Sequence, residues 1–176
     1  MRTRSWIGAT SLLLALAPAA AAAQSGRVSL EARGGVAIPR GDLRNGGAHS
    51  GFAAGLDLMH SMAPWLSAYV GVSRDEFDGG FSSSGAQLGG KIVPGVWGST
   101  TPWLNVGVLG QKMTAGRAES DFGFGVEGGA GADFALTNRL SLTPALRYRT
   151  YDAAFNAAEL SARYWVMTFG AHLHLR

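Results

Sequence analysis

The sequence predicts an all-β chain that folds as a closed, antiparallel, up-and-down transmembrane β-barrel of eight strands after a cleaved signal peptide. Three observations lead to this prediction. Apolar and polar residues alternate with a period of two along most of the chain, which is typical of strands with one apolar and one polar face. Clusters of Gly, Pro, Asn, Asp and Ser interrupt this alternation. Beyond the N-terminal segment, no run of about 18 apolar residues offers a helical membrane span.

The N-terminal segment has the composition of a secretory signal peptide. Arg2 and Arg4 give a positive start, residues 6–18 are apolar, and three small residues at 21–23 precede Gln24. We therefore predict a signal peptide over residues 1–23 and a single barrel domain over residues 24–176. The alternative is an uncleaved helical anchor, but the apolar stretch is short for a helix that crosses a membrane.

Charge and cysteine content exclude several classes of function. The whole chain carries a formal charge of +3, from 15 basic and 12 acidic residues. Without Arg2 and Arg4 it would carry +1, so the basic isoelectric point is no argument for nucleic-acid binding. The chain has no cysteine, which excludes disulfides, thiol nucleophiles and thiolate metal sites.

Eight strands follow in order, each ended by turn residues. The third and fifth begin with the same Pro-Trp-Leu sequence, as expected of a meander built from repeated hairpins. Pro144 falls inside the seventh, which predicts a bulge or a later strand start there. The predicted strands are 27–38, 51–59, 65–73, 85–93, 103–111, 122–136, 140–150 and the closing stretch 164–176.

The connections between these strands alternate in length. Four are long and polar or rich in small residues, two are short, and one, at 94–102, is intermediate. This alternation is expected of an up-and-down barrel whose two ends face different surroundings. The long connections are 39–50, 74–84, 112–121 and 151–159, and the short ones are 60–64 and 137–139.

The two faces of the strands differ in charge and in glycine content. One parity is free of charge, whereas the other collects charged residues, amides and most strand glycines. Glycine on a water-facing strand surface costs stability, but inside an eight-stranded barrel it leaves room for a few long side chains. Charges there must pair. We therefore predict a structural polar network in the lumen, formed by Glu31, Arg33, Asp57, Lys91, Glu127, Asp133, Arg147 and Arg149.

Aromatic residues favour a barrel in a membrane over a soluble one. Two belts of aromatic side chains are expected where a barrel crosses two interfaces. The alternative is a soluble, exported, lipocalin-like barrel that turns its apolar face inward and binds an apolar ligand. The predicted belts contain Trp65, Trp97 and Trp103 at one end and Phe122, Tyr148 and Trp165 at the other.

The chain from residue 27 to residue 176 resembles the small eight-stranded outer-membrane β-barrel family, such as the OmpA transmembrane domain and OmpX. LEARGGVAIPRGD at 30–42, NRLSL at 138–142 and the closing strand carry the resemblance. It implies a cell outer-membrane location in Gram-negative bacteria, and contacts with outer-membrane lipid, lipopolysaccharide and the assembly machinery, as a monomer. The chain departs from the family at its end, which is Arg176 and not an aromatic residue.

No stretch of the sequence predicts a catalytic, cofactor or metal site. Residues 123–128 match G-x-G-x-x-G, but alternation runs through the match, so interior glycines explain it. His172 and His174 share a face without an evident third ligand. The related lipid A deacylases use His, Ser and an acidic residue, and the comparable stretch here, 147–156, has neither His nor Ser.

The predicted function is therefore a structural or loop-mediated surface interaction, without enzymatic activity and without a cofactor. The charged segments 74–78 and 117–121 could contact lipopolysaccharide, divalent ions or a partner, since rigid scaffolds carry function on their loops. The alternative from another class is a barrel enzyme that modifies lipid A.

Overall fold

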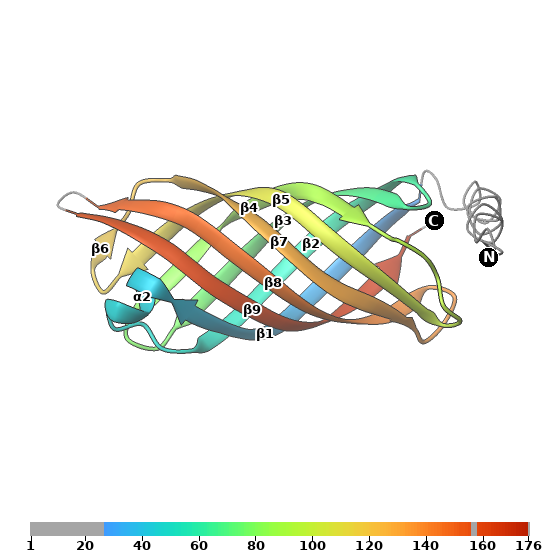
Figure 1. Cartoon of the computed structure of the whole chain (residues 1–176), viewed down its shortest axis with the longest axis horizontal. Coiled ribbons are helices and arrows are strands. Elements are labelled where there is room, and N and C mark those ends of the chain that lie inside the picture. Colours follow the sequence, from blue (N-terminus) through green and yellow to red (C-terminus); the bar gives the residue numbers. More distant parts are fainter. Residues whose placement is uncertain (1–26, 156–157, 176) are drawn as a thin grey trace, which may run out of the picture.

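The computed structural model describes residues 27–155 and 158–175, and in it the chain forms a closed antiparallel β-barrel (Figure 1). Each of the eight long strands pairs with its neighbour in sequence, and β9 pairs with β1 to close the ring. The predicted signal peptide lies outside the described residues. The barrel strands are β1 (Val28–Arg40), β2 (Gly51–Ala63), β3 (Leu66–Phe77), β4 (Phe81–Ile92), β5 (Thr100–Ala115), β7 (Gly123–Ala135), β8 (Leu140–Phe155) and β9 (Ala158–His174).

The two ends of the barrel carry different connections. The end where β1 begins and β9 finishes holds the β2–β3, β4–β5 and β7–β8 turns, and we call it the terminal end (Figure 1). The opposite end, the loop end, holds the five-residue helix α2 (Gly41–Asn45) and the two-residue strand β6 (Ala118–Glu119). No helix in the described ranges is long and apolar enough to cross a membrane.

Three of the four predicted long loops are mostly strand. The β3–β4 hairpin turns between Phe77 and Phe81, and β8 and β9 still pair at Phe155 and Ala158. The barrel strands are therefore 12 to 17 residues long, beyond the roughly 9–11 needed to span a membrane. The prediction of long loops was wrong because it relied on polar composition. These residues belong to hydrogen-bonded strands that extend past the apolar part of the barrel surface.

The apolar parity faces outward, as the sequence predicts. Phe124 and Phe169 are the most exposed examples on the strands, at 79% and 66%. The buried polar residues, including Arg33, Glu127 and Arg149, face the lumen. The lipocalin-like alternative is wrong, because it requires the opposite arrangement of the two faces.

One predicted belt residue lies inside the barrel. Trp65 and Trp97 are exposed at the terminal end, and Trp165 packs against Tyr148 with tilted rings whose centroids are 4.9 Å apart. Trp103, however, is only 2% exposed and faces the lumen. It shares parity with Asn105, so its place in the alternation, and not its position at a strand start, determines its direction.

Pro144 causes neither a bulge nor a late strand start. Strand β8 begins at Leu140, and its register against β9 runs unbroken from Leu140↔Leu173 to Phe155↔Ala158. Against β7, the pairs on either side of Pro144, Gly131↔Ala145 and Phe134↔Leu142, belong to one register. Proline has no N–H to donate, and the pairing with β7 is interrupted at Thr143 and Pro144 but resumes in the same register.

Helix α2 closes the loop end of the lumen. Its Leu43 is completely buried and belongs to a cluster of apolar side chains contributed by several strands. Phe77 and Tyr164 meet edge to face in this cluster, with ring centroids 5.2 Å apart. The interior is therefore apolar at the loop end and polar below it.

Candidate functional site: the polar lumen

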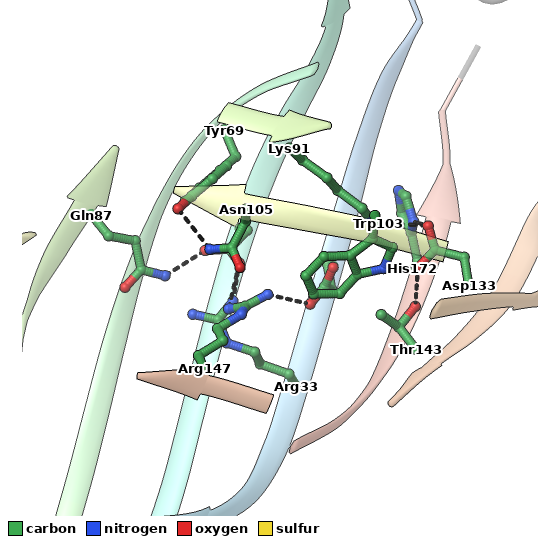
Figure 2. A network of polar contacts seen from close by, with 12 residues as sticks. Arg33, Tyr69, Gln87, Lys91, Trp103, Asn105, Asp133, Thr143, Arg147 and His172 are labelled. Atoms are coloured by element: carbon green, nitrogen blue, oxygen red, sulfur yellow. Dashed lines mark hydrogen bonds and ion pairs between the residues drawn. The ribbon is translucent and has the colours of Figure 1, made fainter. Parts of the chain in front are cut away.

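The middle of the lumen holds ion pairs from neighbouring and opposite strands (Figure 2). Arg33 of β1 pairs with Asp57 of β2. Arg147 of β8 reaches Oδ2 of the same Asp57 at 3.4 Å and Oε1 of Glu31 at 3.1 Å. Both arginines and both acids are at least nine-tenths buried, so each charge depends on the others for its stabilisation.

Arg149 is the most connected cation of the network. Its Nε donates to Glu127 Oε2 at 3.0 Å and its Nη1 donates to Asp75 Oδ2 at 2.8 Å. Its remaining nitrogen donates to Gln87 Oε1 at 3.0 Å. The planar guanidinium suits such divergent pairing, because its donors point in fixed directions.

Asp75 is a network member that the sequence analysis missed. It was assigned to a charged loop at 74–78, but β3 continues through it and its side chain is fully buried. Besides Arg149, it accepts a hydrogen bond of 2.9 Å from the hydroxyl of Tyr164. Its parity, shared with Gly71 and Ser73, was the signal that could have placed it inside.

Two glycines make room for a tyrosine in this layer. The Tyr69 hydroxyl donates to Glu127 Oε1 at 2.6 Å and accepts from the Asn105 amide at 3.1 Å. A Cβ built on Gly89 or on Gly107 would lie 2.5 Å from that hydroxyl oxygen. A larger residue at either position would displace Tyr69. Interior glycine therefore leaves room for a long side chain here, as the sequence analysis expected.

Asp133 organises the polar layer nearest the terminal end (Figure 2). Its Oδ2 accepts from Lys91 Nζ at 2.8 Å, and its Oδ1 accepts from Trp103 Nε1 at 3.0 Å and from Thr143 at 2.9 Å. The Lys91 ammonium also lies 4.5 Å from the centre of the Trp103 ring, a cation–π contact. Asp133 is thus held in one orientation from three strands.

The structure brings the eight predicted network residues into one polar lumen. Four cations, with Lys91 at one end and Arg149 at the other, face the four predicted acids and Asp75. Eight strands leave little interior space, and here ion pairs and the α2 cluster occupy it. The ion pairs link neighbouring and opposite strands across the central lumen.

A cavity of about 290 Å³ lies between this network and the terminal end. Residues of the β2–β3, β4–β5 and β7–β8 turns line it, together with Ser29, Lys91, Asp133, His172 and His174. Ser29 Oγ lies 2.8 Å from His172 Nε2, and His172 Nδ1 lies 3.5 Å from Asp133 Oδ2. The sequence analysis did not find this Ser/His/acid grouping, because its members are on β1, β9 and β7.

The two histidines lie together without forming a metal centre. The rings of His172 and His174 are 4.5 Å apart between centroids. Within residues 27–155 and 158–175, no group of three or more His, Cys, Asp or Glu side chains is arranged to hold a metal ion.

Comparison with known proteins agrees with this architecture. The family model for the outer membrane protein beta-barrel domain matches residues 9–176. The chain belongs to this family. It is therefore an outer-membrane protein, and the apolar outer wall is the surface that faces lipid. No curated protein sequence matches the chain.

Solved structures with similar folds include small barrels of the outer membrane. Neisserial surface protein A superposes with a TM-score of 0.70 at 15% identity, covering 83% of this chain and 96% of that one. The N-terminal barrel domain of Pseudomonas aeruginosa OprF gives 0.60 at 11% identity, covering 86% and 98%. Pseudomonas aeruginosa OprG gives 0.58 at 15% identity, with the same coverage. At these identities the likeness concerns the fold alone.

Proposed function

We propose that this outer-membrane barrel acts through its loop end, by binding the anionic headgroups of lipopolysaccharide and presenting its loops at the cell surface. Short turns mark the periplasmic end of such barrels, so the loop end faces outward. One observation carries the proposal: the strands extend past the apolar wall, and this extension carries outward-facing charges. The role involves no chemical step.

Two arginines lie directly opposite each other on this extension. Arg40 of β1 and Arg163 of β9 are paired in register and both are exposed. Like charges directly opposite on neighbouring strands are destabilising, and neither arginine forms an ion pair with any described residue. The row two residues lower is Ile38↔Trp165, at the edge of the aromatic belt. The arginine pair is therefore at the level expected for lipid phosphates.

A second feature adds another arginine beside this pair. A cavity of about 260 Å³ is lined by Arg40, Arg44 and His49 at the base of the α2 loop. Phosphate groups are strong acceptors for guanidinium donors. An anion bound here would screen the repulsion between Arg40 and Arg163.

As part of this proposal, the outer-membrane assembly machinery inserts the barrel, and the barrel acts as a monomer. Closure through β1 and β9 leaves no free strand edge for pairing with a second copy. Sedimentation in detergent should give the mass of one chain and its bound detergent; a stable dimer would contradict this part.

Binding of purified lipopolysaccharide to the detergent-solubilised barrel tests the proposal. The double variant Arg40→Gln/Arg163→Gln should bind at least about tenfold more weakly, since each charge-assisted hydrogen bond contributes roughly 1.5–3 kcal/mol. Arg139→Gln, an exposed arginine at the terminal end, is the control and should bind like the wild type. Equal affinity for all three proteins would contradict the proposal.

A further inference from the structure

At the terminal end, Ser29, His172 and Asp133 contact one another in series. The proposed surface role does not involve these contacts. Ser29 and His172 are 4% and 6% exposed, and their oxygen and Nε2 are 2.8 Å apart. Asp133 lies on the other side of the imidazole, 3.5 Å from Nδ1. All three side chains line the 290 Å³ cavity.

The contacts determine which imidazole nitrogen carries the hydrogen in the neutral ring. A carboxylate only accepts, so the nitrogen that faces Asp133 is the one that carries a hydrogen. Nδ1 has no hydrogen-bond partner closer than this carboxylate contact. In the neutral ring Nε2 then holds a lone pair, and the Ser29 hydroxyl donates to it. This is the tautomer needed to activate a hydroxyl nucleophile.

The carboxylate is itself held in place. Trp103 and Thr143 bind one of its oxygens, and Lys91 binds the oxygen that faces His172. Asp133 therefore cannot rotate away from the imidazole without losing three hydrogen bonds. The Lys91 ammonium that holds this carboxylate also lines the cavity.

We propose that the terminal-end cavity is an acyl-transfer site in which Ser29 is the nucleophile, His172 is the general base and Asp133 positions His172. The cavity volume limits the substrate to a small carboxylic ester that enters from the periplasmic side. This inference is independent of lipopolysaccharide binding, which concerns the other end of the barrel.

The reaction balances without a cofactor. Ser29 Oγ attacks the ester carbonyl carbon while its proton passes to His172 Nε2. The tetrahedral intermediate collapses, the bond to the leaving oxygen breaks, and that oxygen takes the proton from His172. Water then attacks the acyl-serine with His172 again as base, releasing the carboxylic acid and restoring Ser29.

The first test uses the full barrel folded in detergent, with 4-nitrophenyl acetate as substrate and a fluorophosphonate as covalent label. The wild type should release nitrophenolate and gain one label on Ser29, located by peptide mass spectrometry. Ser29→Ala and His172→Ala should lower the rate by about 10²–10⁴-fold, the usual contribution of such groups. His60→Ala, an exposed histidine outside the cavity, should leave the rate unchanged.

A gel-mobility difference between unheated and boiled samples reports whether each variant is folded. A folded wild type that takes no label, or a folded Ser29→Ala that hydrolyses the ester at the wild-type rate, would overturn the proposal. Asp133→Asn tests positioning: kcat should fall while KM stays near the wild-type value. A merely structural role would leave kcat of the folded fraction unchanged.

A second test uses the absence of cysteine from the chain. Ser29→Cys and Ser67→Cys each place a single thiol in the same cavity, and the rate of alkylation by iodoacetamide measures its activation. A base beside Ser29 predicts alkylation at least about tenfold faster at residue 29, with the advantage lost in Ser29→Cys/His172→Ala. Equal rates at the two positions would contradict activation by His172.

Discussion

The two ends of the lumen differ in polarity and in packing. At the loop end, Leu43 of α2 completes an apolar cluster resembling the core of a soluble protein. At the terminal end, polar side chains surround a cavity instead. The strands are continuous between the two ends, so the difference arises from their inward-facing side chains and from helix α2, which lies at the loop end. The closed end and the ion-pair layer stabilise the barrel, whereas the hollow end is where a small molecule can reach reactive groups.

Removing the central cation should have the largest effect. In Arg149→Met, Asp75 and Glu127 lose their main partner inside the lumen. Breaking a buried pair in this way costs about 3–5 kcal/mol. Urea unfolding in detergent should show that loss, whereas Arg139→Met, exposed in the β7–β8 turn, should unfold like the wild type. A loss below 1 kcal/mol would mean that the network contributes little to stability.

The second-largest loss of unfolding free energy is expected from a change in the apolar cluster at the loop end. Leu43→Ala removes a completely buried side chain from the α2 cluster, and such changes cost about 2–5 kcal/mol. Leu88→Ala, on the outer wall of β4, should cost less in detergent because that side chain is already 56% exposed. Equal unfolding free energies for the two variants would show that the helix does not seal the lumen.

A single hydrogen bond at the hollow end should matter less. Trp103→Phe keeps a ring beside Lys91 but removes the donor to Asp133 Oδ1, which Thr143 still binds. The expected loss is about 1 kcal/mol. Trp97→Phe, 69% exposed, should change the unfolding free energy by less than about 0.5 kcal/mol. If Trp103→Phe lowered the unfolding free energy as much as Arg149→Met, the central ion-pair layer and the terminal-end layer would contribute equally to stability.

The smallest effect is expected on the outer wall of the loop end. Arg74 and Glu76 form an ion pair of 2.8 Å, but both side chains are more than half exposed. Pairs of this kind contribute about 0–1 kcal/mol, so Arg74→Ala should barely shift the urea midpoint. Because salt screens exposed charges, any shift should shrink further in high salt; a shift that persists would indicate a buried role for Arg74.

The sequence predicted the barrel because its evidence is repeated along the chain. Alternation placed Phe124 outside and Glu127 inside, and each strand repeats that pattern. Asp75 and Trp103 show where local composition was misleading. Asp75 lies among charged residues and Trp103 lies beside a turn. Only their place in the alternation predicts that both side chains face the lumen. Helix α2 spans five residues, too few for a helical period to be visible.

The Ser29–His172–Asp133 grouping could not be predicted for a different reason. Ser29 and His172 are 143 positions apart in the chain, and register between the first and last strands decides that they meet. A shift of one residue would turn one of these side chains to the lipid. Such a contact depends on closure geometry, which no local pattern encodes.

The closing pair β1–β9 also has a consequence for biogenesis. Because the first and last strands each supply one member of the hydroxyl–imidazole pair, the pair exists only in a chain whose ring is complete. A reactive residue 29 would therefore distinguish a finished barrel from an intermediate that is inserted but still open, and its rate of appearance would time the last step of assembly.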